Sequence, residues 1–126
     1  MRDYKNLKVW ERSHRLTLEV YESTSSFPKH ELFGLTSQIR RSAGSIGANL
    51  AEGCGRRSEA EMARFVTIAM GSASELEYHL LLARDLKILS SVKHSSLQTE
   101  LTEIRMMLSA LFAAISKGST SKSASA

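Results

Sequence analysis

Apolar residues recur at three- and four-residue spacing along most of the chain, the pattern of amphipathic helices. The clearest case is the stretch from residue 35 to residue 53. At about 100° per residue, its apolar and small positions share one arc, as in a helix that packs on a core: Leu35, Ile39, Ser42, Ala43, Ile46, Leu50 and Gly53. We predict a helix that begins between Lys29 and Thr36 and ends at Gly53, because glycine readily adopts the left-handed conformation that closes helices.

The opposite arc of this helix carries small residues where a solvated face would carry charged ones. Arg40 lies at one end of this small-residue ridge, which consists of Gly44, Gly47, Ala48 and Ala51. A glycine in a helix interior costs roughly 1 kcal/mol relative to alanine. Close approach of a second backbone would offset that cost, so the ridge predicts contact with another chain. The alternative is that these small residues are simply tolerated.

Three further segments have helical periodicity: 7–24, 59–87 and 92–117. Pro28 interrupts the pattern between the first and second helices, because proline cannot donate a helical hydrogen bond. The segment from Ser58 to Glu61 has the capping-box pattern that opens a helix.

The helix predicted at 59–87 is apolar nearly all round in its C-terminal half, where Leu82 lies on a second apolar arc. Such a helix is buried on more than one side, which favours oligomerisation. We therefore predict an all-α, antiparallel up-down-up-down four-helix bundle over residues 1–117 that forms homo-oligomers. Residues 118–126 are small and polar, and we predict a disordered tail there.

Length and composition agree with one helical domain. The chain has 126 residues, of which 42% are hydrophobic and one is proline, enough for a single core. A single cysteine excludes an internal disulfide, the N-terminus lacks the apolar run of a secretory signal, and no apolar stretch approaches the ~20 residues of a membrane span. We expect a cytoplasmic protein with no membrane partner. The net charge of +4 favours a polyanionic partner only weakly.

Motifs for catalysis and metal binding are missing from the sequence. It has one Glu-x-x-His pair, Glu11 and His14, whereas di-iron bundles use two such pairs, and it has no glycine-rich phosphate loop. Glu75 and His79 lie four residues apart and could bind a metal ion, but such a pair is more often a local contact. Cys54, near Arg56, could be a reactive thiol; with no partner base, we interpret it as an exposed loop thiol. We expect no enzymatic activity, metal or cofactor.

Arginines carry the stronger signal. Five of them lie near the second and third predicted helices: Arg40, Arg41, Arg56, Arg57 and Arg64. The planar guanidinium holds phosphate or carboxylate with two hydrogen bonds, and the turn that carries Arg56 and Arg57 presents the free amides of a helix N-terminus. We therefore predict contact with nucleic-acid backbone, foremost through these two residues.

The same arginines have a second possible partner. They could pair with Glu52, Glu59 and Glu61, within one chain or between chains. For Arg40 and Arg41, which lie close to the small-residue ridge, an inter-chain salt bridge is an equally good interpretation. Reading of bases has no support, because the sequence shows neither a recognition helix nor an exposed stacking platform.

The sequence also resembles the four-helix bundle family of the 23S rRNA intervening-sequence proteins, which includes accessory proteins of diversity-generating retroelements. The resemblance covers roughly residues 3 to 116, and the segment from Ser37 to Gly53 is its most specific part. It rests on Trp10, Phe27, Pro28, Glu31, Gly34, Leu35, Ser37, Gln38, Ile39, Arg40, Arg41, Ser42, Ser45, Ile46, Ala48, Asn49, Leu50, Ala51, Glu52, Gly53, Arg57, Phe65, Ala69, Gly71, Ser72, Ala73, Glu75, Leu76 and Glu77.

The resemblance implies an antiparallel bundle that assembles into a ring of five subunits, a basic surface that binds RNA or DNA, and no enzymatic activity. Gly44 and Gly47 make the second helix richer in glycine than the family pattern, which bears on packing between chains. The function that we predict is low-specificity binding of nucleic-acid backbone. The alternatives are a protein-interaction scaffold, such as an accessory subunit of a reverse transcriptase, and a metal-binding bundle that uses Glu75 and His79.

Overall fold

A computed structural model describes the backbone of residues 2–125 and the side chains of residues 2–117. Its elements are two short 3-10 helices and four long α-helices: η1 (Tyr4–Asn6), α1 (Lys8–Thr24), η2 (Lys29–Glu31), α2 (Leu35–Cys54), α3 (Glu59–Asp85) and α4 (Ser91–Ser125). The predicted number and order of the long helices are confirmed, as are the approximate bounds of the first three; the fourth was predicted to end at residue 117, whereas α4 runs to Ser125. The tail predicted to be disordered, residues 118–126, lies outside the residues described in full and stays a prediction.

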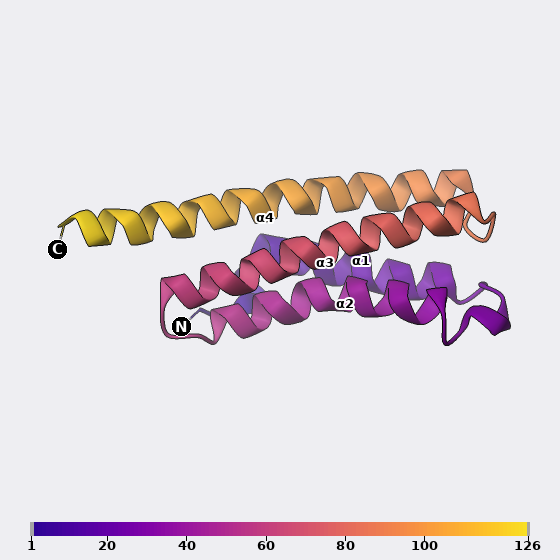
Figure 1. Cartoon of the computed structure of the whole chain (residues 1–126), viewed down its shortest axis with the longest axis horizontal. Coiled ribbons are helices and arrows are strands. Elements are labelled where there is room, and N and C mark those ends of the chain that lie inside the picture. Colours follow the sequence, from indigo (N-terminus) through magenta and orange to yellow (C-terminus); the bar gives the residue numbers. More distant parts are fainter. Residues whose placement is uncertain (1, 126) are drawn as a thin grey trace.

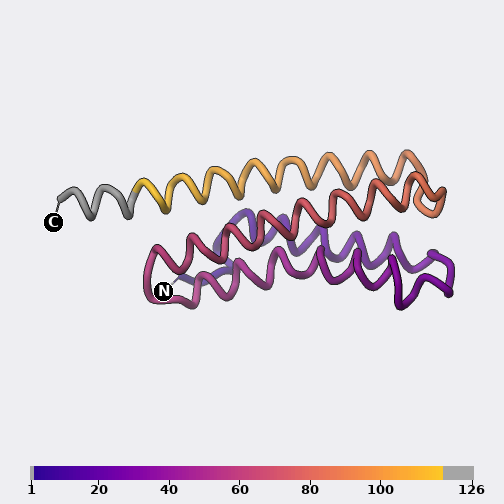
Figure 2. The backbone as a smooth tube through the Cα atoms, in the orientation of Figure 1, coloured from indigo at the N-terminus to yellow at the C-terminus, as the bar shows by residue number. Residues whose placement is uncertain are grey.

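The four long helices run alternately up and down, and consecutive helices lie side by side (Figures 1 and 2). Helix α1 contacts α2 and α4, and α3 contacts the same two helices, so the bundle is closed. The N-terminus and the α2–α3 turn lie at one end, which we call the turn end (residues 2–7 and 55–58). The other two connections lie at the opposite end, the tip end (residues 25–34 and 86–93).

The core contains the apolar stripes that the periodicity predicts. Its largest fully buried side chains come from all four helices: Val20, Ile39, Ile46, Leu50, Cys54, Val66, Leu76, Leu80, Leu97, Leu101, Ile104 and Leu108. Two buried serines lie within the stripes, Ser13 and Ser42. Their hydroxyl groups donate to the carbonyls of Val9 and Gln38, four residues earlier, so neither leaves an unpaired polar atom in the core.

The predicted left-handed closure at Gly53 is wrong. Helix α2 continues through Gly53 to Cys54, and no glycine among the described residues has a positive φ. A Cβ atom on Gly53 would lie 2.9 Å from Cβ of Phe65 on α3. Glycine is therefore required for the close approach of α2 and α3. The left-handed conformation occurs instead at Lys87, with φ 62°, where α3 ends.

Cys54 is not the exposed loop thiol that we predicted. It is the last residue of α2 and is 1% exposed. Its carbonyl accepts a hydrogen bond of 3.0 Å from the amide of Arg2, which ties the N-terminal segment to the turn end. Burial raises the pKa of the Cys54 thiol. Because the thiolate is the reactive form, a buried thiol with a raised pKa is unreactive.

Among the described residues, none of the helices combines the length and the apolar character that crossing a bilayer requires.

Candidate nucleic-acid interface

Two arginines flank one aromatic ring at the turn end. The guanidinium carbons of Arg56 and Arg64 each lie 4.8 Å from the centroid of the Phe65 ring. Attraction between a cation and the face of an aromatic ring holds both side chains near the start of α3. The side chain of Ser58 accepts the amide of Glu61 at 3.1 Å, which confirms the predicted N-cap and fixes the turn that carries the arginines.

The carboxylates at the turn end form ion pairs with some of its arginines and not with others. Glu52 pairs with Arg56 at 3.3 Å, and Glu59 pairs with Arg2 at the same distance. Arg57 is exposed and has no hydrogen bond, ion pair or ring contact within residues 2–117. Intrachain pairing, the alternative that we weighed, therefore applies to Arg56 and not to Arg57. Sequence reasoning missed Arg2, because only the fold brings the N-terminus beside Glu59.

Arg40 lies apart from the other predicted arginines. Its Nε donates to the Thr24 hydroxyl at 2.9 Å, and its guanidinium lies 4.7 Å from the centroid of the Tyr21 ring. Both partners belong to α1. Arg40 therefore links α2 to α1, whereas Arg56 and Arg64 lie against the Phe65 ring of α3.

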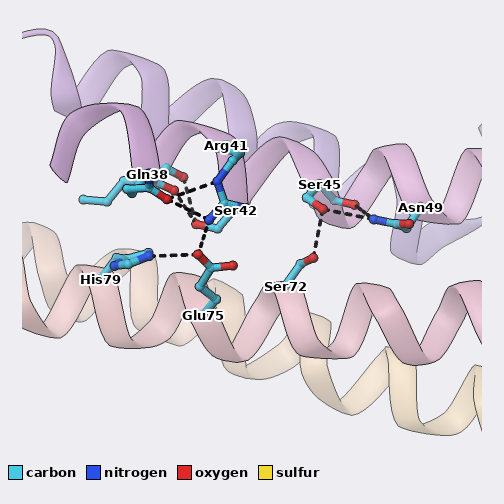
Figure 3. Close-up of polar contacts among 9 residues, drawn as sticks. Gln38, Arg41, Ser42, Ser45, Asn49, Ser72, Glu75 and His79 are labelled. Carbon is cyan, nitrogen blue, oxygen red and sulfur yellow. Dashed lines mark hydrogen bonds and ion pairs between the residues drawn. The ribbon is translucent and has the colours of Figure 1, made fainter. Parts of the chain in front are cut away.

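Arg41 belongs to a polar seam between α2 and α3 (Figure 3). Its guanidinium donates to the Gln38 side chain on its own helix and to the Glu75 carboxylate on α3. Glu75 also bonds Nε2 of His79 at 3.1 Å. The hydrogen bond from His79, and then the one from Arg41, lowers the pKa of Glu75. Arg41 is therefore held by a carboxylate of its own chain.

The seam continues along the same two helices as a second set of contacts. The hydroxyl groups of Ser45 and Ser72 lie 2.9 Å apart, and the Asn49 amide donates to the Ser45 carbonyl at 2.8 Å. Sequence reasoning missed these residues, although a signal was present. Polar side chains recur at three- and four-residue spacing on both helices: Gln38, Ser42, Ser45 and Asn49 on α2, with Ser72, Glu75 and His79 on α3.

Glu75 and His79 form the local contact that was the favoured interpretation of this pair, and Arg41 of α2 also pairs with Glu75. Within the described part of the chain, no group of three or more His, Cys, Asp or Glu side chains is placed to hold a metal ion. The Glu75 carboxylate is thus ion-paired between α2 and α3.

The small-residue ridge forms the floor of a groove of about 280 Å³ between α1 and α2, with aromatic side chains on its other wall. A Cβ atom on Gly47 would lie 3.3 Å from Nε1 of Trp10, so this glycine already has a close neighbour in its own chain. Gly44 has no atom within 4 Å of such a position. Leu82 is not among the groove residues and packs against the core from α3.

These features define an all-helical bundle with a buried apolar core, a polar seam between α2 and α3, and an arginine-bearing turn between the same two helices. Comparison with models of protein families identifies the family of this bundle. The model of the 23S rRNA-intervening sequence proteins matches residues 5–110. The chain therefore belongs to the 23S rRNA-intervening sequence protein family, as the resemblance in sequence indicated.

A solved structure has the same fold. It is the crystal structure of a protein with unknown function from the S23 ribosomal protein family of Bacteroides thetaiotaomicron VPI-5482. The TM-score is 0.75 at 27% sequence identity, and the match covers 82% of the present chain and 97% of the other. Among curated proteins, none matches the sequence.

Proposed function

We propose that this protein binds nucleic-acid backbone with low sequence specificity through the arginines of its turn end, and that it catalyses no reaction. The observation that carries the proposal is the arrangement of Arg56, Arg57 and Arg64 on and beside one ordered turn. Arg57 has no partner among the described residues, and the contacts of Arg64 are with an aromatic ring rather than a carboxylate. Both guanidinium groups are free to bind phosphate.

Arg56 is a further contact in this proposal. Its ion pair with Glu52 is exposed, and exposed pairs contribute little free energy, so a phosphate can replace the carboxylate. Arg41 and Arg40 are weaker candidates for phosphate contact than the sequence suggested, because each has partners in its own chain. Their role is to join α2 to its neighbours.

Titration of a short DNA duplex, and of a structured RNA of similar length, at several salt concentrations tests the proposal. The slope of log K against log salt changes by about 0.9 for each duplex phosphate that the protein neutralises. We expect Arg57→Gln/Arg64→Gln to weaken binding and to flatten this slope. The matched control is Arg84→Gln at the tip end, where Arg84 pairs with its neighbour Asp85 much as Arg56 pairs with Glu52.

Two outcomes would contradict nucleic-acid binding. One is a wild-type affinity that does not change with salt. The other is an equal loss in the Arg84→Gln control, which would indicate general charge rather than a site. Either result would favour the alternative function, a scaffold that docks a protein, such as an accessory subunit of a nucleic-acid enzyme.

We also propose that the small-residue ridge packs against a second copy of the chain, in a ring whose five subunits are implied by the family resemblance. The open position at Gly44 and the apolar groove support this contact. Gly44→Leu should reduce the particle mass in light scattering while helicity is kept. Gly71→Leu on α3, where a Cβ atom also meets nothing within 4 Å, is the control. An unchanged mass for Gly44→Leu would place the interface elsewhere.

A further inference from the structure

The tip end exposes large apolar side chains that are not part of the core. Phe33 is 93% exposed and Val92 is 83% exposed, the two highest values among the large apolar side chains described. Leu32 and Leu86 are about half exposed at the same end. Leu32 and Phe33 lie in the α1–α2 connection, Leu86 follows α3 and Val92 lies in the first turn of α4; both connections lie at one end of the bundle (Figure 1). The tip end therefore presents exposed apolar side chains from two separate segments.

Unpaired positive charge surrounds this surface. Lys29, Lys87 and Lys93 lie in or next to the two connections, and none of them forms an ion pair within residues 2–117. Two of the nearby carboxylates are engaged: Asp85 pairs with Arg84, and an oxygen of Glu31 accepts the amide of Leu35 at 3.2 Å. Glu22, near the end of α1, is the remaining acidic side chain of this region. With Arg84 included, the region carries four positive and three negative formal charges, so the balance is positive by one.

We propose that the tip end binds the surface of an anionic lipid bilayer. Phe33 and Val92 enter the boundary between headgroups and acyl chains, and the three lysines remain among the headgroup phosphates. Long lysine side chains suit this position, because they keep the ammonium group in the polar layer while their methylene stems cover apolar surface. The proposal is independent of nucleic-acid binding at the turn end.

The sequence led us to expect no membrane partner, and that expectation rested on the lack of a spanning segment. Interfacial binding needs no such segment. It needs exposed apolar side chains and cations at one end of the molecule, and here two segments 50 residues or more apart in sequence bring both to the tip end. A lipid interface deforms around projecting side chains, whereas a protein partner must offer a complementary hollow of about 1,000 Å² or more in total buried area.

Co-sedimentation of the full-length protein with vesicles tests the proposal. We expect binding to vesicles of phosphatidylcholine with phosphatidylglycerol and little binding to phosphatidylcholine alone. Phe33→Ser/Val92→Ser should reduce partitioning by at least about tenfold, because the variant buries less apolar area at the interface. Lys29→Gln/Lys87→Gln/Lys93→Gln should reduce it by about a hundredfold, since each lysine contributes about fivefold near an anionic surface.

Tyr78→Ser/Met106→Ser is the matched control, because these side chains are also more than half exposed but lie on the flanks of α3 and α4. It should bind vesicles like the wild type, and so should Arg57→Gln/Arg64→Gln, which separates this surface from the proposed nucleic-acid site. All the replaced side chains are exposed except that of Lys93, which is half-buried, so thermal midpoints should change little. Equal binding to both vesicle types, or equal loss in the control, would overturn the proposal. A particle mass that falls in Phe33→Ser/Val92→Ser, without vesicle binding by the wild type, would instead assign the tip end to contact with a second copy.

Discussion

The two ends of the bundle are built in opposite ways. At the turn end, a short connection joins α2 to α3, Gly53 meets Phe65, Cys54 is buried, and Arg56 and Arg64 lie against the Phe65 ring. At the tip end, longer connections leave Phe33 and Val92 in solvent and the lysines without partners. Helix packing restricts which residues can occupy the turn end. The exposed residues of the tip end are not restricted by packing, so their apolar character indicates a binding role.

The largest effect should come from the tight contact at the turn end. Gly53→Ala would place a Cβ atom 2.9 Å from Cβ of Phe65, closer than real atoms approach. We expect a loss of about 1–3 kcal/mol in the free energy of unfolding, because the two helices must move apart. Urea denaturation measures it.

Gly71→Ala is the control for that substitution. Gly71 lies in the interior of α3, outside the small-residue ridge, and the new Cβ position has no atom within 4 Å. Alanine there should raise stability by up to about 1 kcal/mol, because it favours the helix more than glycine does. Equal effects at the two positions would show that the contact with Phe65 does not limit the turn end.

At the tip end, Lys87, which has a positive φ, gives a smaller effect of opposite sign. Lys87 has φ 62°, a conformation that costs a residue with a side chain roughly 1 kcal/mol or more. Lys87→Gly should therefore stabilise the protein by about 0.5–1 kcal/mol in urea denaturation. Lys87→Ala removes the charge but keeps the Cβ atom, so it should change stability little. A destabilised Lys87→Gly variant would mean that the lysine side chain supports the connection.

The smallest effect should come from the seam that links the two ends along α2 and α3. The lowered pKa of Glu75 means that its carboxylate stabilises the fold above the ordinary glutamate pKa of about 4.3. That contribution is lost as the pH falls through the pKa of the folded state. Glu75→Gln should cost about 0.5 kcal/mol at pH 7, because the side chain is partly exposed, and less at pH 3.

Unfolding of Glu75→Gln and wild type at both pH values, followed by circular dichroism, measures this difference. Glu22→Gln is the control, since Glu22 is exposed and has no partner within residues 2–117. A difference between Glu75→Gln and wild type that is as large at pH 3 as at pH 7 would argue against the ion pair with Arg41 and His79.

The sequence pointed to most of the arginines of the candidate site, but not to the neighbouring helix that each of them contacts. Arg56 and Arg64 do come together, because Arg56 lies in the α2–α3 connection and Arg64 lies in the first two turns of α3. Arg40 and Arg41 are adjacent in sequence yet point to different neighbours, α1 and α3, because successive residues on a helix are about 100° apart. Which neighbour each one meets depends on how the helices are placed around the core.

The sequence by itself determined the four helices, their apolar stripes and the cap at Ser58, because these depend on residues within a few positions of one another. Only the tertiary structure decided that Gly53 serves a helix contact, that Cys54 is buried and that Trp10 covers Gly47. It also decided that Phe33 and Val92 lie at one end of the bundle. Each of these facts joins segments far apart in the chain, and local periodicity contains no information about which distant surfaces meet.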